Sequence, residues 1–378
     1  MGLLLGMFFT YVGIGMVWSI LTVYATSLGA TAATAGATIA AFGASRLIVS
    51  VPAGLLSEKL GRVRVMIIGL ALVTISSFVA LTVNSMITLL GCLVIQGVGS
   101  SFYGTSALSA VTDRGTPTTR VRDMAAYQTA TQIGLSIGPG LGGIVASLWG
   151  YGAPFIFQGV MALIALAAVA RIPHFERVKT TEATRTSAGG ILVLIAAVGA
   201  LSYSLFFSRV ASSWILMPLI AHNEMGLGIG TVGILLTGSS IANLVILRFI
   251  SALVKRFGRL TTLVGATGIV LTSLLLLAIG GSEIMLWGFT ILIGAGMGLA
   301  TALVTSHAAD QAPPGQVGAV MGTMRMTTDL GAITGPILAG FCVDLPWLGV
   351  TGGIGLCATM LILTLTIFLI TANRNRVG

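Results

Sequence analysis

Long uncharged stretches alternate with short polar breaks along the whole chain. Each stretch reaches the roughly 20 mostly apolar residues that a helix needs to cross a bilayer. Continuous apolar runs favour helices over a β-barrel, whose strands would alternate apolar and polar positions. The pattern therefore predicts twelve membrane-spanning helices, at residues 3–26, 35–57, 65–84, 87–111, 124–148, 153–172, 190–220, 231–253, 261–280, 284–308, 319–343 and 348–372.

The composition supports a membrane protein and excludes an ordinary soluble domain. Hydrophobic residues make up 56% of the 378 residues and charged residues only 8%, against about 25% charged residues in a soluble domain. A net charge of +9 would suggest nucleic acid binding in a soluble protein, but here the basic residues gather in particular loops. We expect a lipid bilayer as partner, and no nucleic acid.

The basic residues occupy alternate loops, and this predicts the topology. Cytoplasmic loops carry an excess of Lys and Arg, so we expect both termini and the central segment in the cytoplasm of a bacterial inner membrane. The loops without basic residues would then face the other side. The cytoplasmic set holds Lys59, Arg62, Arg64, Arg114, Arg120, Arg122, Lys255, Arg256 and Arg259.

The two halves of the chain repeat each other at a constant offset of 197 residues. Gly61 corresponds to Gly258, and Asp113 corresponds to Asp310. A register kept over several predicted helices indicates an internal duplication of one structural unit. We therefore predict an N-terminal six-helix half at 1–172, a cytoplasmic linker at 173–189 and a C-terminal six-helix half at 190–378.

The loop after the second predicted helix reads Gly54-Leu-Leu-Ser-Glu58-Lys59-Leu-Gly61-Arg62. It resembles the loop motif of the major facilitator superfamily, which implies a gate at the cytoplasmic side. Gly61 allows a tight turn, and Glu58 can face the positive N-terminal end of a helix. The alternative is a solvated basic loop that only sets the topology. The gating candidates are Gly54, Glu58, Lys59, Gly61, Arg62, Asp113, Arg120, Gly258 and Arg259.

The fifth predicted helix carries Gly134, Gly138, Pro139, Gly142 and Gly143. These residues resemble the antiporter motif of the superfamily's drug exporters. Proline kinks a helix and glycines admit a close neighbour, although a generic kinked packing helix would show the same residues. The resemblance implies an all-α fold of two six-helix bundles related by a pseudo-two-fold axis.

One departure concerns the fourth predicted helix. Drug exporters of this group often carry an arginine, linked to proton transfer, three residues before a Gln-Gly pair. Here Leu93 stands at that place before Gln96 and Gly97. The coupling ion, a proton or another ion, therefore stays open.

Ionisable residues inside the predicted helices are few, and each is a site candidate because a charge there costs about 2.5 kcal/mol or more. Arg46 and Arg209 have no assigned carboxylate and could bind an anion. Arg325 and Asp329 are four residues apart and can pair. The pair either fixes its helix, or Asp329 takes up a proton or cation when the arginine is drawn toward substrate. Further pocket candidates are Gln128, Gln132 and Tyr203.

The chain lacks the motifs of an intramembrane enzyme or an ATP-driven pump. There is no His-Glu-x-x-His run and no Walker-type phosphate loop, so we expect no enzyme, no cofactor and no metal. The favoured function is a secondary active transporter working by alternating access, as a monomeric efflux antiporter for a drug-like or organic-anion substrate. The alternatives are an uptake symporter or exchanger of small anions, and a transport-dead sensor or assembly protein of the same fold.

Overall fold

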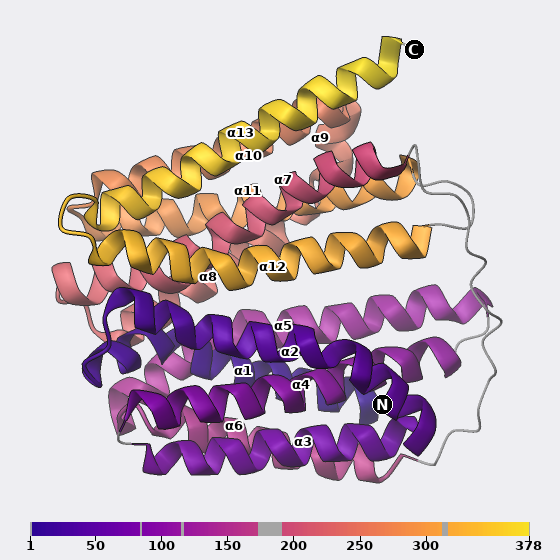
Figure 1. Ribbon diagram of the computed structural model, residues 1–378, viewed down its shortest axis with the longest axis vertical. Helices are drawn as coiled ribbons and strands as arrows, with labels where there is room; N and C mark the ends of the chain where they lie inside the picture. Colours follow the sequence, from indigo (N-terminus) through magenta and orange to yellow (C-terminus); the bar gives the residue numbers. More distant parts are fainter. Residues whose placement is uncertain (1, 84, 115–116, 173–190, 312–316, 378) are drawn as a thin grey trace. The chain divides into compact units, whose positions relative to one another are not determined.

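The computed structural model describes residues 2–83, 85–114, 117–172, 191–311 and 317–377. Figure 1 shows that these residues form helices joined by short connections, without a strand among them. The prediction of an all-α chain is confirmed. The helices of the first repeat are α1 (Gly2–Ser27), α2 (Ala32–Leu60), α3 (Arg62–Val79), α4 (Met86–Arg114), α5 (Pro117–Trp149) and α6 (Ala153–Ala170).

The second repeat has seven helices in the described part of the chain, because one predicted span is broken in two. They are α7 (Ile191–Ala211), α8 (Ile229–Leu247), α9 (Ile250–Phe257), α10 (Arg259–Ile279), α11 (Glu283–Gln311), α12 (Val317–Asp344) and α13 (Gly349–Val377).

Eleven helices of the described residues are long and apolar enough to cross a membrane. The predicted span at 124–148 is helical, as α5, but is not among the eleven. Its exposed Gln128 and Gln132 and its many glycines lower its mean hydropathy. A helix of this composition is better suited to a protein-lined or water-lined position than to lipid.

Two predicted spans depart from straight helices. The span predicted at 190–220 ends as an α-helix at Ala211 and continues in two π-helical turns, Ser212–Leu216 and Leu219–Glu224. The Ser212 hydroxyl donates to the carbonyl of Ser208, 2.6 Å away, which is the acceptor that an α-helix assigns to the Ser212 N–H. Pro218, between the two turns, has no N–H to donate.

The span predicted at 231–253 is interrupted between α8 and α9. The N–H of Arg248 donates to the carbonyl of Val245, and the N–H of Phe249 donates to that of Ile246. Bonds to the third preceding residue tighten the chain into a turn, and the helix restarts as the short α9.

The described residues fall into two compact units. The first unit takes its residues from 1–30, 37–180 and 227–237, and the second unit from 31–36, 181–226 and 238–378. The start of α2 thus belongs to the second unit and the start of α8 to the first. The predicted linker at 173–189 lies outside the described residues, and the half boundaries at 172 and 190 remain predictions.

Equivalent helices pack together in both units. In the first unit α1 packs against α5 and α6, while α3 packs against α4 and α6. In the second unit α7 packs against α12 and α13, while α10 packs against α11 and α13. The repeat seen in the sequence is therefore a repeat of packing. The first unit's core joins α1, α3, α4 and α6 through buried Met7, Leu70, Tyr103 and Val169.

Candidate functional site

Three glycines of the predicted α5 motif lie against the backbone of α1. A Cβ atom added to Gly134 would lie 2.8 Å from the carbonyl oxygen of Phe8, and one on Gly138 would lie 2.6 Å from that of Val12. Gly142 meets the carbonyl of Met16 in the same way. Any side chain here would collide with backbone, so the glycines set the distance between the two helices.

The other side of α5 contacts the start of α8, inside the same unit. A Cβ atom on Gly143 would lie 2.8 Å from the carbonyl oxygen of Ile229, and one on Gly233 would lie 2.5 Å from that of Pro139. The glycines of the motif therefore contact two different helices, α1 and α8. Sequence reasoning identified these glycines but did not divide them between partners.

Helix α12 repeats this packing in the second unit. Gly335 meets the backbone of α7 at Phe207, with an added Cβ 2.6 Å from its carbonyl oxygen. Gly340 meets the carbonyl of Ala32 at the start of α2, and Gly36 meets the carbonyl of Pro336. The α12 glycines and the start of α2 have counterparts 197 residues away on α5 and α8, while Phe207 of α7 takes the place of Val12 on α1. Helices α5 and α12 are therefore structurally equivalent.

The polar candidates on α5 and α12 also occupy equivalent positions. Gln128 and Gln132 are exposed on α5, and 197 residues later stand Arg325 and Asp329 on α12. Arg325 Nε lies 3.4 Å from Asp329 Oδ2, with the two side chains 62% and 32% exposed. The ion pair expected from the spacing is present. Because charges are costly against lipid, we expect this exposed face to meet water.

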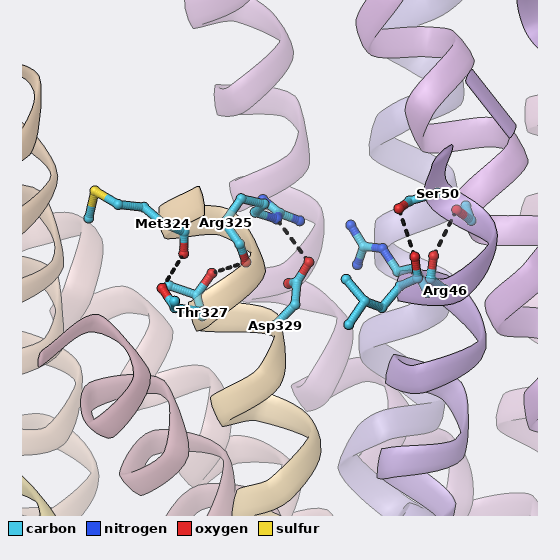
Figure 2. A network of polar contacts seen from close by, with 9 residues as sticks. Arg46, Ser50, Met324, Arg325, Thr327 and Asp329 are labelled. Atoms are coloured by element: carbon cyan, nitrogen blue, oxygen red, sulfur yellow. Dashed lines mark hydrogen bonds and ion pairs between the residues drawn. The ribbon is translucent and has the colours of Figure 1, made fainter. Parts of the chain in front are cut away.

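Figure 2 shows the guanidinium of Arg325 turned along α12 toward the Asp329 carboxylate. One helical turn holds both groups, and the Thr327 hydroxyl between them bonds back to the Met324 carbonyl at 2.8 Å. Both members of the pair thus lie on α12, as their spacing predicted.

The two arginine candidates on other helices differ from each other. Arg209 is half-buried on α7, three residues before the first π-helical turn. Within the described residues no carboxylate pairs with it. Arg46, labelled in Figure 2, lies in the middle of α2. Its backbone carbonyl accepts a hydrogen bond from the Ser101 hydroxyl at 3.0 Å.

Tyr203, a predicted pocket residue, ties α7 to α12. Its hydroxyl lies 2.7 Å from the Thr334 hydroxyl, and its backbone carbonyl faces Gly331. This contact gives Tyr203 a packing role whether or not its ring reaches a substrate.

The gating candidates lie around the junctions between helices. Gly61 and Gly258 both have a positive φ, 94° and 80°, so both start the next helix through a turn that favours glycine. Arg259 pairs with Asp310, 2.5 Å apart, and Arg62 donates to the Ser57 hydroxyl at 3.2 Å. Glu58 and Lys59 are exposed, and Gly54 is loosely packed, with an added Cβ 3.8 Å from Thr105.

Two gating candidates, Asp113 and Arg120, lie on α4 and α5, but their side chains are outside the described residues. The nearby departure from the exporter pattern, Leu93, is fully buried in α4. At this position the helix therefore offers an apolar packing residue where drug exporters often place a charge.

Sequence reasoning missed Asp344, the last residue of α12. Its carboxylate oxygens accept hydrogen bonds from the backbone N–H groups of Ala32 and Ala33, each at 2.9 Å. Both donors belong to the first turn of α2. The sequence feature that could have identified Asp344 is its position, as an acidic residue directly after the predicted span at 319–343.

Comparison with known proteins identifies the family. The profile of the Major Facilitator Superfamily matches residues 3–209 and 199–377. The chain belongs to this superfamily of membrane transporters and is a multi-pass membrane protein, as predicted.

Two relatives cover most of the chain. The quinolone resistance protein NorA of Staphylococcus aureus is 26% identical over 350 residues, which span 89% of this chain and 88% of NorA. The uncharacterized MFS-type transporter MJ1560 of Methanocaldococcus jannaschii is 26% identical over 352 residues, 89% of each chain. The resemblance to the drug/proton antiporter group is confirmed by the first of these.

Solved structures agree on the fold. A bacterial homologue of the human lysosomal transporter Spinster, in an inward-facing occupied conformation, superposes with a TM-score of 0.80 at 14% identity, covering 98% of this chain and 96% of that one. The nucleoside transporter NupG gives 0.78 at 15% identity, covering 97% and 98%. The predicted major facilitator fold is confirmed.

Proposed function

We propose that this protein is an efflux antiporter that exports a drug-like or organic-anion substrate in exchange for a coupling ion, with Asp329 as the coupling carboxylate. The observation that carries the proposal is the Arg325–Asp329 pair, which places a partly exposed carboxylate on a helix that can cross the membrane. The relation to NorA, a quinolone resistance protein, supports export of a drug-like molecule.

The geometry of the pair favours exchange of partners. The separation of 3.4 Å is long, and both groups are partly exposed, a kind of ion pair that contributes about 0–1 kcal/mol. A proton, a cation or a group of the substrate can therefore displace either partner at little cost.

Whether transport is antiport or symport depends on which member of the pair, Asp329 or Arg325, the substrate binds. If a substrate group competes with a proton for Asp329, the two cannot bind together, and the result is exchange. If an anionic substrate takes Arg325 instead, Asp329 is released to bind a proton at the same time, and the result is symport. The same pair is thus compatible with the favoured antiporter and with the alternative anion symporter. The two mechanisms differ in the direction in which protons move when the substrate crosses the membrane, and this direction can be measured.

Arg209 supplies a place for an acidic group of the substrate. A guanidinium without a carboxylate partner, half-buried in a membrane helix, retains unused donors that bind carboxylates and phosphates in a fork. The first of the two π-helical turns begins three residues after Arg209, and π-helical turns are frequent at functional sites. We assign Arg209 to the anionic part of the substrate and Asp329 to coupling.

The proposal also includes the topology, the location and the oligomeric state. From the basic residues in alternate loops, we place both termini in the cytoplasm of a bacterial inner membrane, and we propose that the protein acts as a monomer. Gln128 and Gln132 line the substrate path of the first unit. The protein carries out transport without catalysis.

Proton movement in liposomes tests the proposal. The purified protein is reconstituted around a trapped pH-sensitive dye, and a quinolone is added outside as the probe substrate. Antiport predicts that quinolone entry drives protons out, whereas symport predicts that protons enter. Asp329→Asn should abolish the proton signal while quinolone counterflow continues. Asp310→Asn, which removes a paired carboxylate at a helix end, should keep the signal. Wild-type coupling in Asp329→Asn would remove the carboxylate from the mechanism.

A further inference from the structure

The N-terminal turns of α2 and α8 pack in the same way against the helices next to them. The start of α2 lies on α12, where Gly36 meets the Pro336 carbonyl, and the start of α8 lies on α5, where Gly233 meets the Pro139 carbonyl. Position 36 corresponds to 233, and position 139 to 336, in the 197-residue register. The backbone contact is therefore common to both repeats.

The polar contact at the two junctions is different. At the α2–α12 junction, the Asp344 carboxylate accepts the N–H groups of Ala32 and Ala33. The equivalent of Asp344 on α5 is Ser147, whose hydroxyl donates to the Ile144 carbonyl of its own helix at 2.7 Å. At this junction, as far as it is described, no side chain accepts the N–H of Ile229 or Gly230.

A carboxylate is an effective capping group for the N-terminus of a helix. The first N–H groups of a helix have no partner within it, and the helix dipole adds positive potential there. Asp344 satisfies two of these groups with charge-assisted hydrogen bonds, whereas the Ser147 hydroxyl donates within its own helix. The α2–α12 junction is accordingly the more strongly held of the two.

The boundary between the compact units crosses α2 at this junction. Residues 31–36 belong to the second unit, and the helix continues in the first unit from residue 37. When the two units move against each other during transport, α2 must either bend near Gly36 or detach its first turn from α12. Detachment requires that both hydrogen bonds to Asp344 break.

We propose that Asp344 is a positioning residue of the transport cycle, which latches the first turn of α2 onto α12. The junction of α8 with α5 has no such latch and opens more readily. This inference goes beyond the proposed function, because it concerns the conformational step and requires neither a particular substrate nor a coupling ion.

Cysteine accessibility tests the latch. Cys92, Cys342 and Cys357 are first replaced by alanine, and a single cysteine is then placed at Ala35 or, in a separate protein, at Val232. Both positions are fully buried, and they correspond in the repeat. The rate of alkylation by a maleimide, measured on protein in nanodiscs without substrate, reports how often each helix start detaches.

The expected results differ between the two junctions. Asp344→Ala should raise the alkylation rate of Ala35→Cys by roughly 2- to 30-fold, the range expected for loss of a capping side chain. The matched change Ser147→Ala should leave the rate of Val232→Cys within about 2-fold, because the Ser147 hydroxyl bonds only within α5. An unchanged rate for Ala35→Cys in a folded Asp344→Ala protein would overturn the latch.

A second variant guards against misfolding. Asp344→Asn keeps the volume of the side chain but loses its charge and one of its two acceptors, so the rate should fall between wild type and Asp344→Ala. A rate equal to wild type in Asp344→Asn would also contradict the proposal. Since no substrate is present, these outcomes are independent of whether the protein proves to be a drug exporter.

Discussion

Helices α5 and α12 occupy the same position in the two repeats, yet their chemistry differs. Both present glycines to two neighbouring helices at the same spacing. Gln128, Gln132 and Ser147 of α5, however, are replaced on α12 by Arg325, Asp329 and Asp344. The comparison teaches that the packing is duplicated because both units need the same close helix contacts. The charges of Arg325, Asp329 and Asp344, by contrast, occur on α12 of the second unit, where we propose coupling and the α2 latch.

The largest effect should come from breaking the shared packing. Gly138→Val and its equivalent Gly335→Val each place a side chain where the Cβ alone would lie 2.6 Å from a backbone oxygen. We expect each to destabilise the protein by about 3 kcal/mol or more, because backbone cannot move aside as a side chain can. Thermal unfolding of purified protein measures this. Gly268→Ala on α10, which meets nothing within 4 Å, is the control, and a tolerated Gly335→Val would show that α12 does not share the packing of α5.

A smaller but decisive effect should follow when α12 is made to resemble α5. The double change Arg325→Gln with Asp329→Gln recreates the neutral pair of α5 without leaving an unpaired charge. Gradient-driven quinolone transport should fall at least about tenfold, while substrate exchange and expression persist, since the weak pair adds little stability. The matched change of Gln128 and Gln132 to alanine should retain the response to the gradient. Equal loss in both proteins would indicate that the two helix faces have the same role.

Next in size is the effect of Arg209 on substrate binding. Gly335 meets Phe207 where Gly138 meets Val12, so the position on α1 equivalent to Arg209 is Ile14. Ile14 is a buried apolar residue, so this guanidinium is another charge present in one repeat only. Arg209→Ala should weaken the affinity for an anionic substrate by roughly tenfold, the worth of a charge-assisted hydrogen bond. Equilibrium binding measures it, with Arg248→Ala, exposed at the break after α8, as the control. Unchanged binding would remove Arg209 from the site.

The smallest effect should come from the ion pair of the second gating copy. Arg259 and Asp310 are 36% and 60% exposed, so the pair should contribute no more than about 1 kcal/mol to stability. A double-mutant cycle of Arg259→Gln and Asp310→Asn, read by thermal unfolding, measures this coupling. A coupling of several kcal/mol would mean that this pair is a dominant structural contact.

The sequence predicted the fold because apolar length and the repeat are local or periodic signals. Arg325 and Asp329 were predicted to pair from their spacing on one helix, which requires no knowledge of the neighbours. The glycines of α5 were recognised as a motif for the same reason. Features of this kind depend on residues close together in the chain.

Other features depend on contacts that no pattern displays. The π-helical turns after Arg209 begin at Ser212 and lie on either side of Pro218, within a strongly apolar pattern that predicts one continuous helix. The Asp344 latch joins residues 312 positions apart. Nothing in the surroundings of Asp344 in the chain distinguishes a latch from an ordinary acid after a membrane span, so its role emerges only from the packed structure.

The central claim is that substrate and proton compete for Asp329, and proton release on binding tests it most directly. Quinolone is added to purified protein in weakly buffered solution, and the pH change is recorded as binding proceeds. The account predicts release of up to about one proton per quinolone bound, and no release from Asp329→Asn. Equal release from Asp329→Asn, or uptake of a proton by the wild type, would contradict it.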